Sequence, residues 1–300
     1  MSTGKKRNFA MNRFETLDVI LCIILSLFAL MIIVPFINVI AVSFTTSAEY
    51  ARTPVLLFPQ SPTLENYKAL ISDARIGVGY RTTLLMLVLG VPINLFLTSS
   101  LAYGLSRSNF PGRKFLFYFV LVTMLFNGGI IPVYLLVRDL GLMNTIWSVI
   151  LTGGINTFYM VIMRNNFQSM PESLIESAKL DGAGEWRILF QVILPLSMPI
   201  IATITLFYTV DRWNEWYYTM LFIRKNNLQT LQLVLRAIVL ESQMVSELEN
   251  ASSTVMDKAA RFTMGIKMAT IMATILPIMC VYPFLQKYFT KGALVGAIKA

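Results

Sequence analysis

Long apolar runs alternate with shorter polar segments along the chain, and six of these runs are long enough to cross a bilayer. A hydrocarbon core about 30 Å thick is spanned by about 20 residues of α-helix. The six runs are 19–42, 84–105, 115–137, 146–163, 199–222 and 264–289. The pattern predicts an all-α polytopic membrane protein with six transmembrane helices.

Two of the runs are less clear than the other four. The fourth run includes Gly153, Gly154 and Asn156, and the sixth includes Pro277 and Pro283. A span tolerates such residues where neighbouring helices satisfy the freed backbone groups. We therefore expect both runs to cross the membrane, as the four clearer runs do.

Basic residues indicate the orientation. The first run is longer than a signal-peptide core and lacks a small-residue cleavage site, so we expect an uncleaved anchor. The basic residues before it are Lys5, Lys6, Arg7 and Arg13. Among the short loops, Arg138 on one side faces three basic residues on the other, which are Arg107, Arg113 and Lys114. The positive-inside rule then places both termini in the cytoplasm.

This orientation divides the chain into three parts. Residues 1–18 form a cytoplasmic N-terminal segment, residues 19–289 a six-span transmembrane domain, and residues 290–300 a cytoplasmic tail. We expect a multi-pass protein of the plasma membrane.

The composition excludes two other classes of protein. Hydrophobic residues make up 56% of the 300 residues and charged residues only 14%, whereas a soluble domain carries about 25% charged residues. Too few charges remain to cover a water-facing surface, so neither a soluble enzyme nor a disordered chain is expected. The net charge of +9 lies in loops and tails between apolar runs, which favours contact with membrane lipid over nucleic acid.

Catalytic and metal-ligating residue types are scarce. Histidine is absent, which excludes His-dependent triads and His metal sites. Cys22 and Cys280 lie inside apolar runs, without the spacing of a zinc site or a disulfide framework. The chain also lacks the Gly-x-x-x-x-Gly-Lys-Ser/Thr phosphate loop. We expect no catalytic residue, no metal and no cofactor in this chain.

Two long polar segments, 46–81 and 226–263, lie on the outer side in this topology. In the first, Thr63 is expected to cap a short helix from Leu64 to about Ile71. In the second, apolar residues at helical spacing predict an amphipathic helix; they are Leu228, Leu231, Leu235, Ile238 and Val239. Loops of this length usually have a function, and a lid that only shields the bundle is the alternative.

The cytoplasmic segment 168–197 predicts two short helices. Ser169 and Glu172 have the spacing of a capping box, and the helix that they start reaches about Asp181. Pro171 suits its first turn. Gly182 suits the left-handed position that ends it.

The second helix follows this glycine and is expected to stop at Pro195. Its apolar stripe consists of Trp186, Leu189, Phe190 and Ile193. Two short amphipathic helices on the inner membrane face suit docking into a groove of a soluble partner. Packing against the protein's own bundle is an equally good interpretation of the shape alone.

The stretch from Glu176 to Ala183, Glu-Ser-Ala-Lys-Leu-Asp-Gly-Ala, resembles the EAA motif of binding-protein-dependent ABC importer permeases. The likeness continues through Phe190, Leu194, Pro195 and Pro199. Ser177 departs from the usual alanine, and the motif glycine falls at Gly182. Spacing, residue types and position between two spans agree, which makes the resemblance specific.

Other segments resemble the carbohydrate permeases of the maltose type. Trp213-Asn214-Glu215 is similar to their Trp-Asn-acid motif, and 283–299 to their C-terminal tail. The segments 61–67, 126–132 and 140–144 look like the subgroup that handles oligosaccharides from complex polysaccharides, including aldouronate-type systems. The resemblance covers nearly the whole chain from the first run onward.

The resemblance implies a transport subunit of an ATP-driven importer of oligosaccharides, some of them uronate-containing, and not an enzyme. It implies as partners a second permease subunit, a cytoplasmic ABC ATPase dimer that uses ATP and Mg, and an extracytoplasmic sugar-binding protein. The first helix of the segment 168–197 is then the coupling helix. Its implied ATPase-coupling residues are Glu176, Ala178, Asp181, Gly182 and Ala183.

A substrate pathway is expected at polar and aromatic residues within the spans, since charges there are costly and normally face a cavity. The residues are Asn127, Asp211, Arg212, Trp213, Asn214, Glu215 and Trp216. The positive charge of Arg212 is compatible with an acidic sugar as the substrate. The alternative is an Arg212–Glu215 pair inside an interfacial aromatic belt. Asn127 with Gly128 and Gly129 fits an unwound segment and a close helix crossing equally well.

Two further alternatives remain at this point. The basic tail resembles an ATPase-contacting segment through Lys287, Lys291, Gly292 and Lys299, or it binds anionic lipid headgroups. An ion-coupled secondary transporter of a small polar solute is the competing function. That function needs an ion or proton relay within the spans, for which only Asp211, Arg212 and Glu215 qualify.

Overall fold

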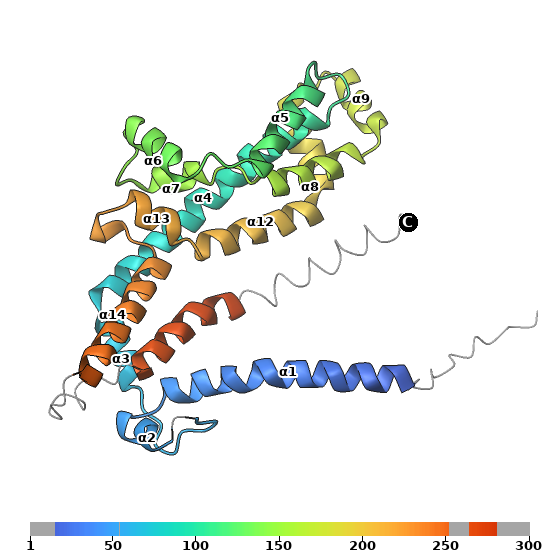
Figure 1. Cartoon of the computed structure of the whole chain (residues 1–300). Helices are drawn as coiled ribbons and strands as arrows, with labels where there is room; N and C mark the ends of the chain where they lie inside the picture. The colour runs from blue at the N-terminus through green and yellow to red at the C-terminus, as the bar shows by residue number, and fades with distance from the viewer. Residues whose placement is uncertain (1–15, 54, 252–263, 281–300) are drawn as a thin grey trace, which may run out of the picture.

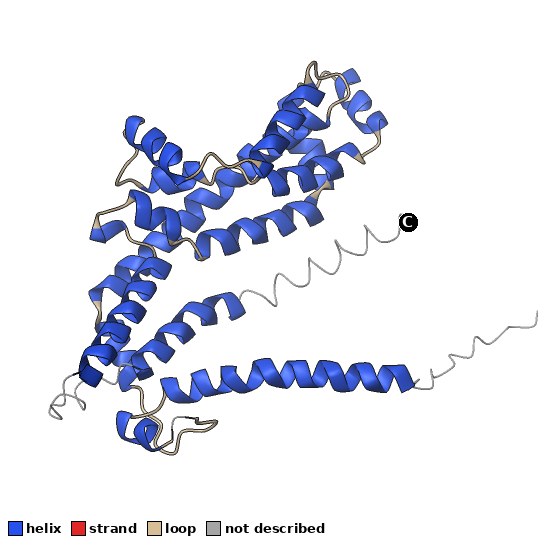
Figure 2. Cartoon of the chain, in the orientation of Figure 1, coloured by secondary structure: helices blue, strands red, loops and turns tan. Residues whose placement is uncertain are grey.

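The computed structural model describes residues 16–53, 55–251 and 264–280, and every regular element in these ranges is helical (Figure 1, Figure 2). The predicted all-α fold is therefore confirmed. The elements are α1 (Thr16–Ser43), α2 (Ser47–Arg52), α3 (Glu65–Ser72), α4 (Ala74–Ser106), α5 (Arg113–Leu125), α6 (Ile130–Asp139), α7 (Ile146–Thr152), α8 (Thr157–Gln168), α9 (Glu172–Leu180), α10 (Glu185–Ile188), the π-helix η1 (Leu189–Ile193), α11 (Leu194–Leu196), α12 (Met198–Trp213), α13 (Tyr217–Phe222), the 3-10 helix η2 (Asn226–Leu228), α14 (Leu231–Ala251) and an unlabelled helix, Met264–Cys280.

Helix α4 is the element around which the others are arranged, and it packs along α8, α12 and α14 (Figure 1). With 33 residues it is about 50 Å long, at 1.5 Å per residue. Helices α3 and α14 lie at one end of α4, and α9 lies at the other (Figure 1). Because a bilayer with its headgroups is about 40–45 Å thick, α4 is long enough to cross it from one surface to the other.

The apolar runs fold into spans of two kinds. The first two runs are the long helices α1 and α4, each long and apolar enough to cross a membrane. Three further pairs are bent: α5 and α6 by 114°, α7 and α8 by 53°, and the stretch Glu185–Leu196 and α12 by 90°. Counting each pair as one span gives five within the described residues, and Met264–Cys280 is a shorter apolar helix. The six-span count stays a prediction.

The third run, 115–137, is not one straight helix, contrary to the expectation from its hydrophobicity. Helix α5 ends at Leu125 and α6 begins at Ile130, and Gly129 between them has a φ of +87°. The Asn127 side chain accepts the Gly129 N–H at 2.9 Å. A β-carbon built at Gly128 or Gly129 would meet nothing within 4 Å. These glycines unwind the chain locally, and within the described residues of this chain no other helix lies close to them.

Helix α14 confirms the amphipathic helix predicted within 226–263, and it belongs to the core. A β-carbon built at Gly79 of α4 would lie only 2.9 Å from the Cα of Leu231. Around this contact, buried residues of five elements pack together: Leu70, Ile76, Trp213, Leu231, Val234, Leu235, Ile238 and Ala269. The short helix α3 begins one residue later than expected, and Thr63 accepts the Glu65 N–H at 3.2 Å.

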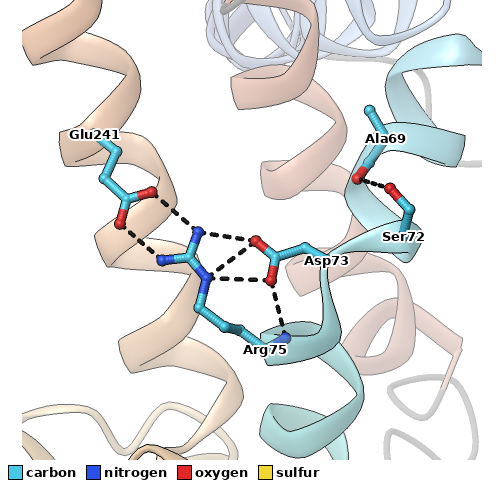
Figure 3. A network of polar contacts seen from close by, with 5 residues as sticks. All are labelled: Ala69, Ser72, Asp73, Arg75 and Glu241. Atoms are coloured by element: carbon cyan, nitrogen blue, oxygen red, sulfur yellow. Dashed lines mark hydrogen bonds and ion pairs between the residues drawn. The ribbon is translucent and has the colours of Figure 1, made fainter.

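A charged network joins α14 to the corner between α3 and α4 (Figure 3). The Arg75 guanidinium donates to Asp73, the N-cap of α4, at 2.8 Å and to Glu241 of α14 at 2.7 Å. Bonding to Arg75 lowers the pKa of both carboxyl groups. Because all three side chains are partly exposed, the network orients α14 more than it adds to the free energy of unfolding.

Helix α1 stands apart from the other helices (Figure 1). Its apolar window is entirely unburied, and Met31 and Ile32 expose 74% and 70% of their surface. Its C-terminal end is attached, because the Asn38 amide donates to the Leu56 carbonyl at 2.8 Å. The apolar surface of α1 is therefore left to lipid or to another chain.

We expect Gly79→Ala to destabilise the protein, because the added methyl group meets the backbone of Leu231 and pushes α14 away from α4. The expected loss is about 1–3 kcal/mol, measured as a lower thermal unfolding midpoint of the detergent-solubilised protein. Gly77→Ala on the same helix is the matched control, since a β-carbon there meets nothing within 4 Å. It should keep or raise the midpoint. Equal midpoints for the two variants would contradict the packing argument.

Candidate functional site

A cavity of about 420 Å³ lies where the break between α7 and α8 faces the break between α12 and α13. The residues that line it are Thr152, Gly153, Ile155, Asn156, Tyr208, Asp211, Arg212, Asn214, Glu215, Trp216, Tyr217 and Tyr218. Carboxylates, amides, hydroxyls and aromatic rings therefore face one space. Such a combination suits a ligand with many hydroxyl groups and apolar faces.

Five of the seven residues predicted for the pathway line this cavity, and Trp213 and Asn127 do not. The Trp213 indole N–H donates to the Thr274 carbonyl at 3.3 Å, and its ring packs edge-on against Tyr80. This side chain belongs to the buried core. Asn127 lies in the exposed break between α5 and α6.

Arg212 is buried and holds one wall of the cavity together. Its guanidinium donates to the carbonyls of Val149, Ile150 and Gly153 at 3.0, 2.9 and 2.9 Å. It also donates to the side-chain oxygen of Asn94 at 3.1 and 3.2 Å. Val149 and Ile150 belong to α7 and Gly153 is its C-cap, and the last carbonyls of a helix lack most of their intrahelical donors. The Val149 carbonyl also accepts the Gly153 N–H at 3.4 Å. A cation at this end of a helix also interacts favourably with the helix dipole.

Glycines make room for this arrangement. β-Carbons built at Gly153 and Gly90 would lie 3.1 and 3.3 Å from guanidinium nitrogens of Arg212. The Asn94 amide donates to the carbonyls of Gly153 and Gly154 at 2.6 and 2.7 Å. Arg212 and Asn94 together satisfy the backbone of the interrupted fourth run, as an apolar environment requires.

The acidic residues of the cavity have partners other than Arg212. The Glu215 carboxylate accepts the Tyr218 N–H at 2.8 Å, at the start of α13. The Asp211 carboxylate accepts the Tyr159 hydroxyl at 2.9 Å. Among the described residues no ion pair joins Arg212 to Glu215. The alternative of a simple Arg–Glu pair is therefore not what the structure shows.

Three residues that the sequence analysis missed complete the site: Asn94, Tyr159 and Tyr208. The Tyr208 hydroxyl lies 2.6 Å from the Thr98 hydroxyl and accepts the Asn156 N–H at 3.0 Å. A lone amide inside an apolar run, such as Asn94, is costly unless it has a partner, and that signal could have found it. The tyrosines carried no such signal, because tyrosine is common at membrane interfaces.

The segment 168–197 contains the predicted turn after its first helix. Gly182 has a φ of +77°, and its N–H donates to the Lys179 carbonyl at 3.0 Å. The Ala183 N–H donates to the Ala178 carbonyl at 2.9 Å. These two bonds form a Schellman motif, in which the left-handed position favours glycine.

The faces of α9 differ in exposure. Ile175 is buried, whereas Glu176 and Asp181 are exposed. Within the described part of the chain, no hydrogen bond or ion pair occupies either carboxylate. The acidic face of α9 is therefore open to a partner.

Two details of this segment differ from the sequence-based prediction. Ser169 has the helical φ and ψ of −79° and −4° and ends α8, so no capping box forms with Glu172. The second helix ends at Leu196, one residue after the predicted stop at Pro195, and the chain then bends by 90° into α12.

The π-helical stretch η1 splits the predicted apolar stripe of the second helix. Leu189 and Ile193 are buried, but Trp186 and Phe190 are exposed and stack on Phe96 of α4. The phase shift arises because a π-helix advances by more residues per turn than an α-helix.

Side chains attach the segment to α4. Glu185 accepts from Lys179 at 2.6 Å and from the Tyr103 hydroxyl at 2.5 Å. The Ser108 hydroxyl donates to Glu172 at 2.9 Å. Side-chain contacts therefore attach α9 and α10 to the C-terminal end of α4.

The predicted tail contacts lie outside the described residues; they are Lys287, Lys291, Gly292 and Lys299. Among the described residues, no group of three or more acidic, Cys or His side chains could hold a metal ion.

We expect Arg212→Lys to destabilise the protein by about 3 kcal/mol, because an ammonium group cannot replace the planar fork that reaches three carbonyls and Asn94. The thermal unfolding midpoint and the amount of protein in the membrane should both fall. Asp211→Asn is the control in the same cavity, since its amide oxygen still accepts from Tyr159. If Arg212→Lys unfolds at the same temperature as the wild-type protein, the hydrogen bonds of the guanidinium are not needed for stability.

Comparison with known proteins gives consistent matches over most of the chain. Residues 94–295 match the family described as binding-protein-dependent transport system inner membrane component. The polygalacturonan/rhamnogalacturonan transport system permease protein YtcP of Bacillus subtilis (strain 168) is 40% identical, over 94% of this chain and 98% of its own length. Protein LplC of the same organism is 41% identical over 89% of each chain.

A solved structure extends the match to three dimensions. It is the crystal structure of a bacterial ABC transporter involved in the import of the acidic polysaccharide alginate. One of its chains superposes with a TM-score of 0.82 and 28% identity, covering 96% of this chain and 100% of that chain. The chain therefore belongs to the family of binding-protein-dependent transport system inner membrane components, as a multi-pass permease subunit of an ABC transporter.

Proposed function

We propose that this permease takes up oligosaccharides that carry uronate groups, delivered by an extracytoplasmic sugar-binding protein. By its name, one relative serves a polygalacturonan/rhamnogalacturonan system, and the structural neighbour serves alginate import. Both polymers are chains of sugars with carboxylates. The cavity beside α12 is the proposed pathway in this subunit, with Asp211, Asn214, Glu215 and Trp216 as its sugar-facing residues.

One observation carries the proposal: the exposed helix α9 is linked to the cavity through continuous structure. The chain runs from α9 through the Glu185–Leu196 helix and turns by 90° into α12, whose far end carries Asp211 and Arg212. Helix α12 has 16 residues and is about 24 Å long. A displacement of α9 is thereby carried to the cavity wall by a rigid element.

The source of that displacement is proposed to be a cytoplasmic ABC ATPase dimer, which binds ATP and Mg. The coupling residues are Glu176, Ala178, Asp181, Gly182 and Ala183. The exposed carboxylates on α9 support this assignment, because they suit a basic groove on a partner. The tail residues Lys287, Lys291, Gly292 and Lys299 are proposed as a second contact with the same partner, on the resemblance alone.

A second permease subunit is the proposed partner within the membrane. The exposed apolar surface of α1 supports this, since within the described residues the apolar window of this helix is left uncovered and is free to pack against another chain. Both termini are proposed to be cytoplasmic, which places α9 inside and α14 outside. In this proposal, residues 1–18 are the cytoplasmic N-terminal segment, residues 19–289 the six-span transmembrane domain and residues 290–300 the cytoplasmic tail. No observation on the described residues favours the ion-coupled alternative.

Two measurements test the proposed function. A tagged copy purified from native membranes should bring with it a second permease and an ATP-binding protein. Cells that lack the chain should lose uptake of radiolabelled trigalacturonate and regain it on complementation. Unchanged uptake in cells without the chain would refute the proposed substrate class.

Gly182→Pro is expected to uncouple ATP hydrolysis from transport. Proline cannot adopt the φ of +77° and removes the N–H that bonds Lys179. In proteoliposomes of the whole transporter, uptake should fall at least about tenfold while ATP hydrolysis continues. Gly184→Pro is the control, because its φ of −74° suits proline. Normal uptake by Gly182→Pro would defeat the coupling assignment.

A further inference from the structure

The cavity poses an electrostatic problem for the substrate proposed above. Asp211 and Glu215 line it with carboxylates, and Arg212 donates its hydrogen bonds to Asn94 and to backbone carbonyls. Like charges in a partly enclosed space repel an anionic sugar. A uronate carboxylate therefore needs a cation other than Arg212.

Arg236 on α14 is such a cation. Its guanidinium carbon lies 3.7 Å from the centre of the Trp216 ring, and Trp216 lines the cavity. Its side chain is exposed. Within the described residues no hydrogen bond or ion pair occupies its guanidinium.

The position of Arg236 is fixed by its helix. One turn earlier, Gln232 donates to the side chain of Asn214, another residue that lines the cavity, at 3.3 Å. The neighbouring Leu235 is buried in the core, and Glu241 is bonded to Arg75 (Figure 3). The same face of α14 therefore meets the cavity at two successive turns, and its register is held from both sides.

Stacking on an aromatic ring leaves the edge of a guanidinium free. The face of Arg236 covers Trp216, while its N–H groups remain able to form a bidentate bond with a carboxylate. An arginine already held against a ring also loses less conformational entropy on binding than a mobile one.

We propose that Arg236 binds a uronate carboxylate of the oligosaccharide at the edge of the cavity and so determines the preference for acidic sugars. The inference rests on the proposed function of this chain. Trp216 orients the guanidinium, and the cavity residues bind the hydroxyl groups of the same ligand.

Two substitutions separate the charge of Arg236 from its packing. Arg236→Lys keeps the charge but loses the planar face, whereas Arg236→Met keeps an apolar stem over Trp216 but loses the charge. In cells with the native binding protein, the maximal uptake rate of trigalacturonate should fall about tenfold in Arg236→Met. It should fall less, about threefold, in Arg236→Lys, because lysine keeps the charge but loses the stacked, bidentate geometry. Lys225→Met, which removes an exposed charge from the loop before α14, should change nothing. Immunoblots should show equal amounts of every variant in the membrane.

The outcomes distinguish this inference from the proposed function. Wild-type uptake by Arg236→Met, or an equal loss in Arg236→Lys, overturns the role of Arg236 while the proposed function stands. Wild-type cells that take up no more trigalacturonate than cells lacking the chain refute the proposed function itself. If Arg236 instead pairs with an acidic group of the binding protein, Arg236→Met will need more loaded binding protein for half-maximal stimulation of ATP hydrolysis. An unchanged half-maximal concentration is expected here.

Discussion

The structure depends on the satisfaction of backbone carbonyls where a membrane span is interrupted. The fourth run breaks at Gly153, where the regular helical bonding of α7 ends in an apolar environment that supplies no water to the remaining carbonyls. Arg212 and Asn94, from two other helices, bond these carbonyls. The break creates room for a polar cavity, and the same contacts tie α4, α7 and α12 together at its wall.

The two ends of α4 present different kinds of chemistry to the two sides of the membrane. At one end, α9 exposes carboxylates and is attached through Glu185 to Lys179 and Tyr103. At the other end, α14 is held by the Arg75 network and brings Arg236 to the cavity. Helix α12 connects the first end to the cavity wall. The proposed coupling helix and the proposed carboxylate-binding residue therefore lie at opposite ends of α4, with the cavity between them.

The candidate site was predictable where a residue type is unfavourable in its sequence context. Asp211, Arg212 and Glu215 stand out because charges are costly inside an apolar run, and all three line the cavity. Trp213 was assigned to the same site by adjacency, but a helical turn directs it into the core. Arg236 was not found, because an arginine on an amphipathic helix is ordinary until its neighbour in space is known.

The sequence by itself determined the helical class, the apolar runs, the amphipathic helix α14 and the glycine that ends α9, because each follows from local spacing or from one residue's conformational freedom. The partners of Arg212, the π-helical phase shift beside α4 and the stacking of Arg236 on Trp216 were decided by tertiary structure. Each of these depends on groups far apart in the chain, and hydrophobicity along one segment carries no information about which distant donor satisfies its backbone.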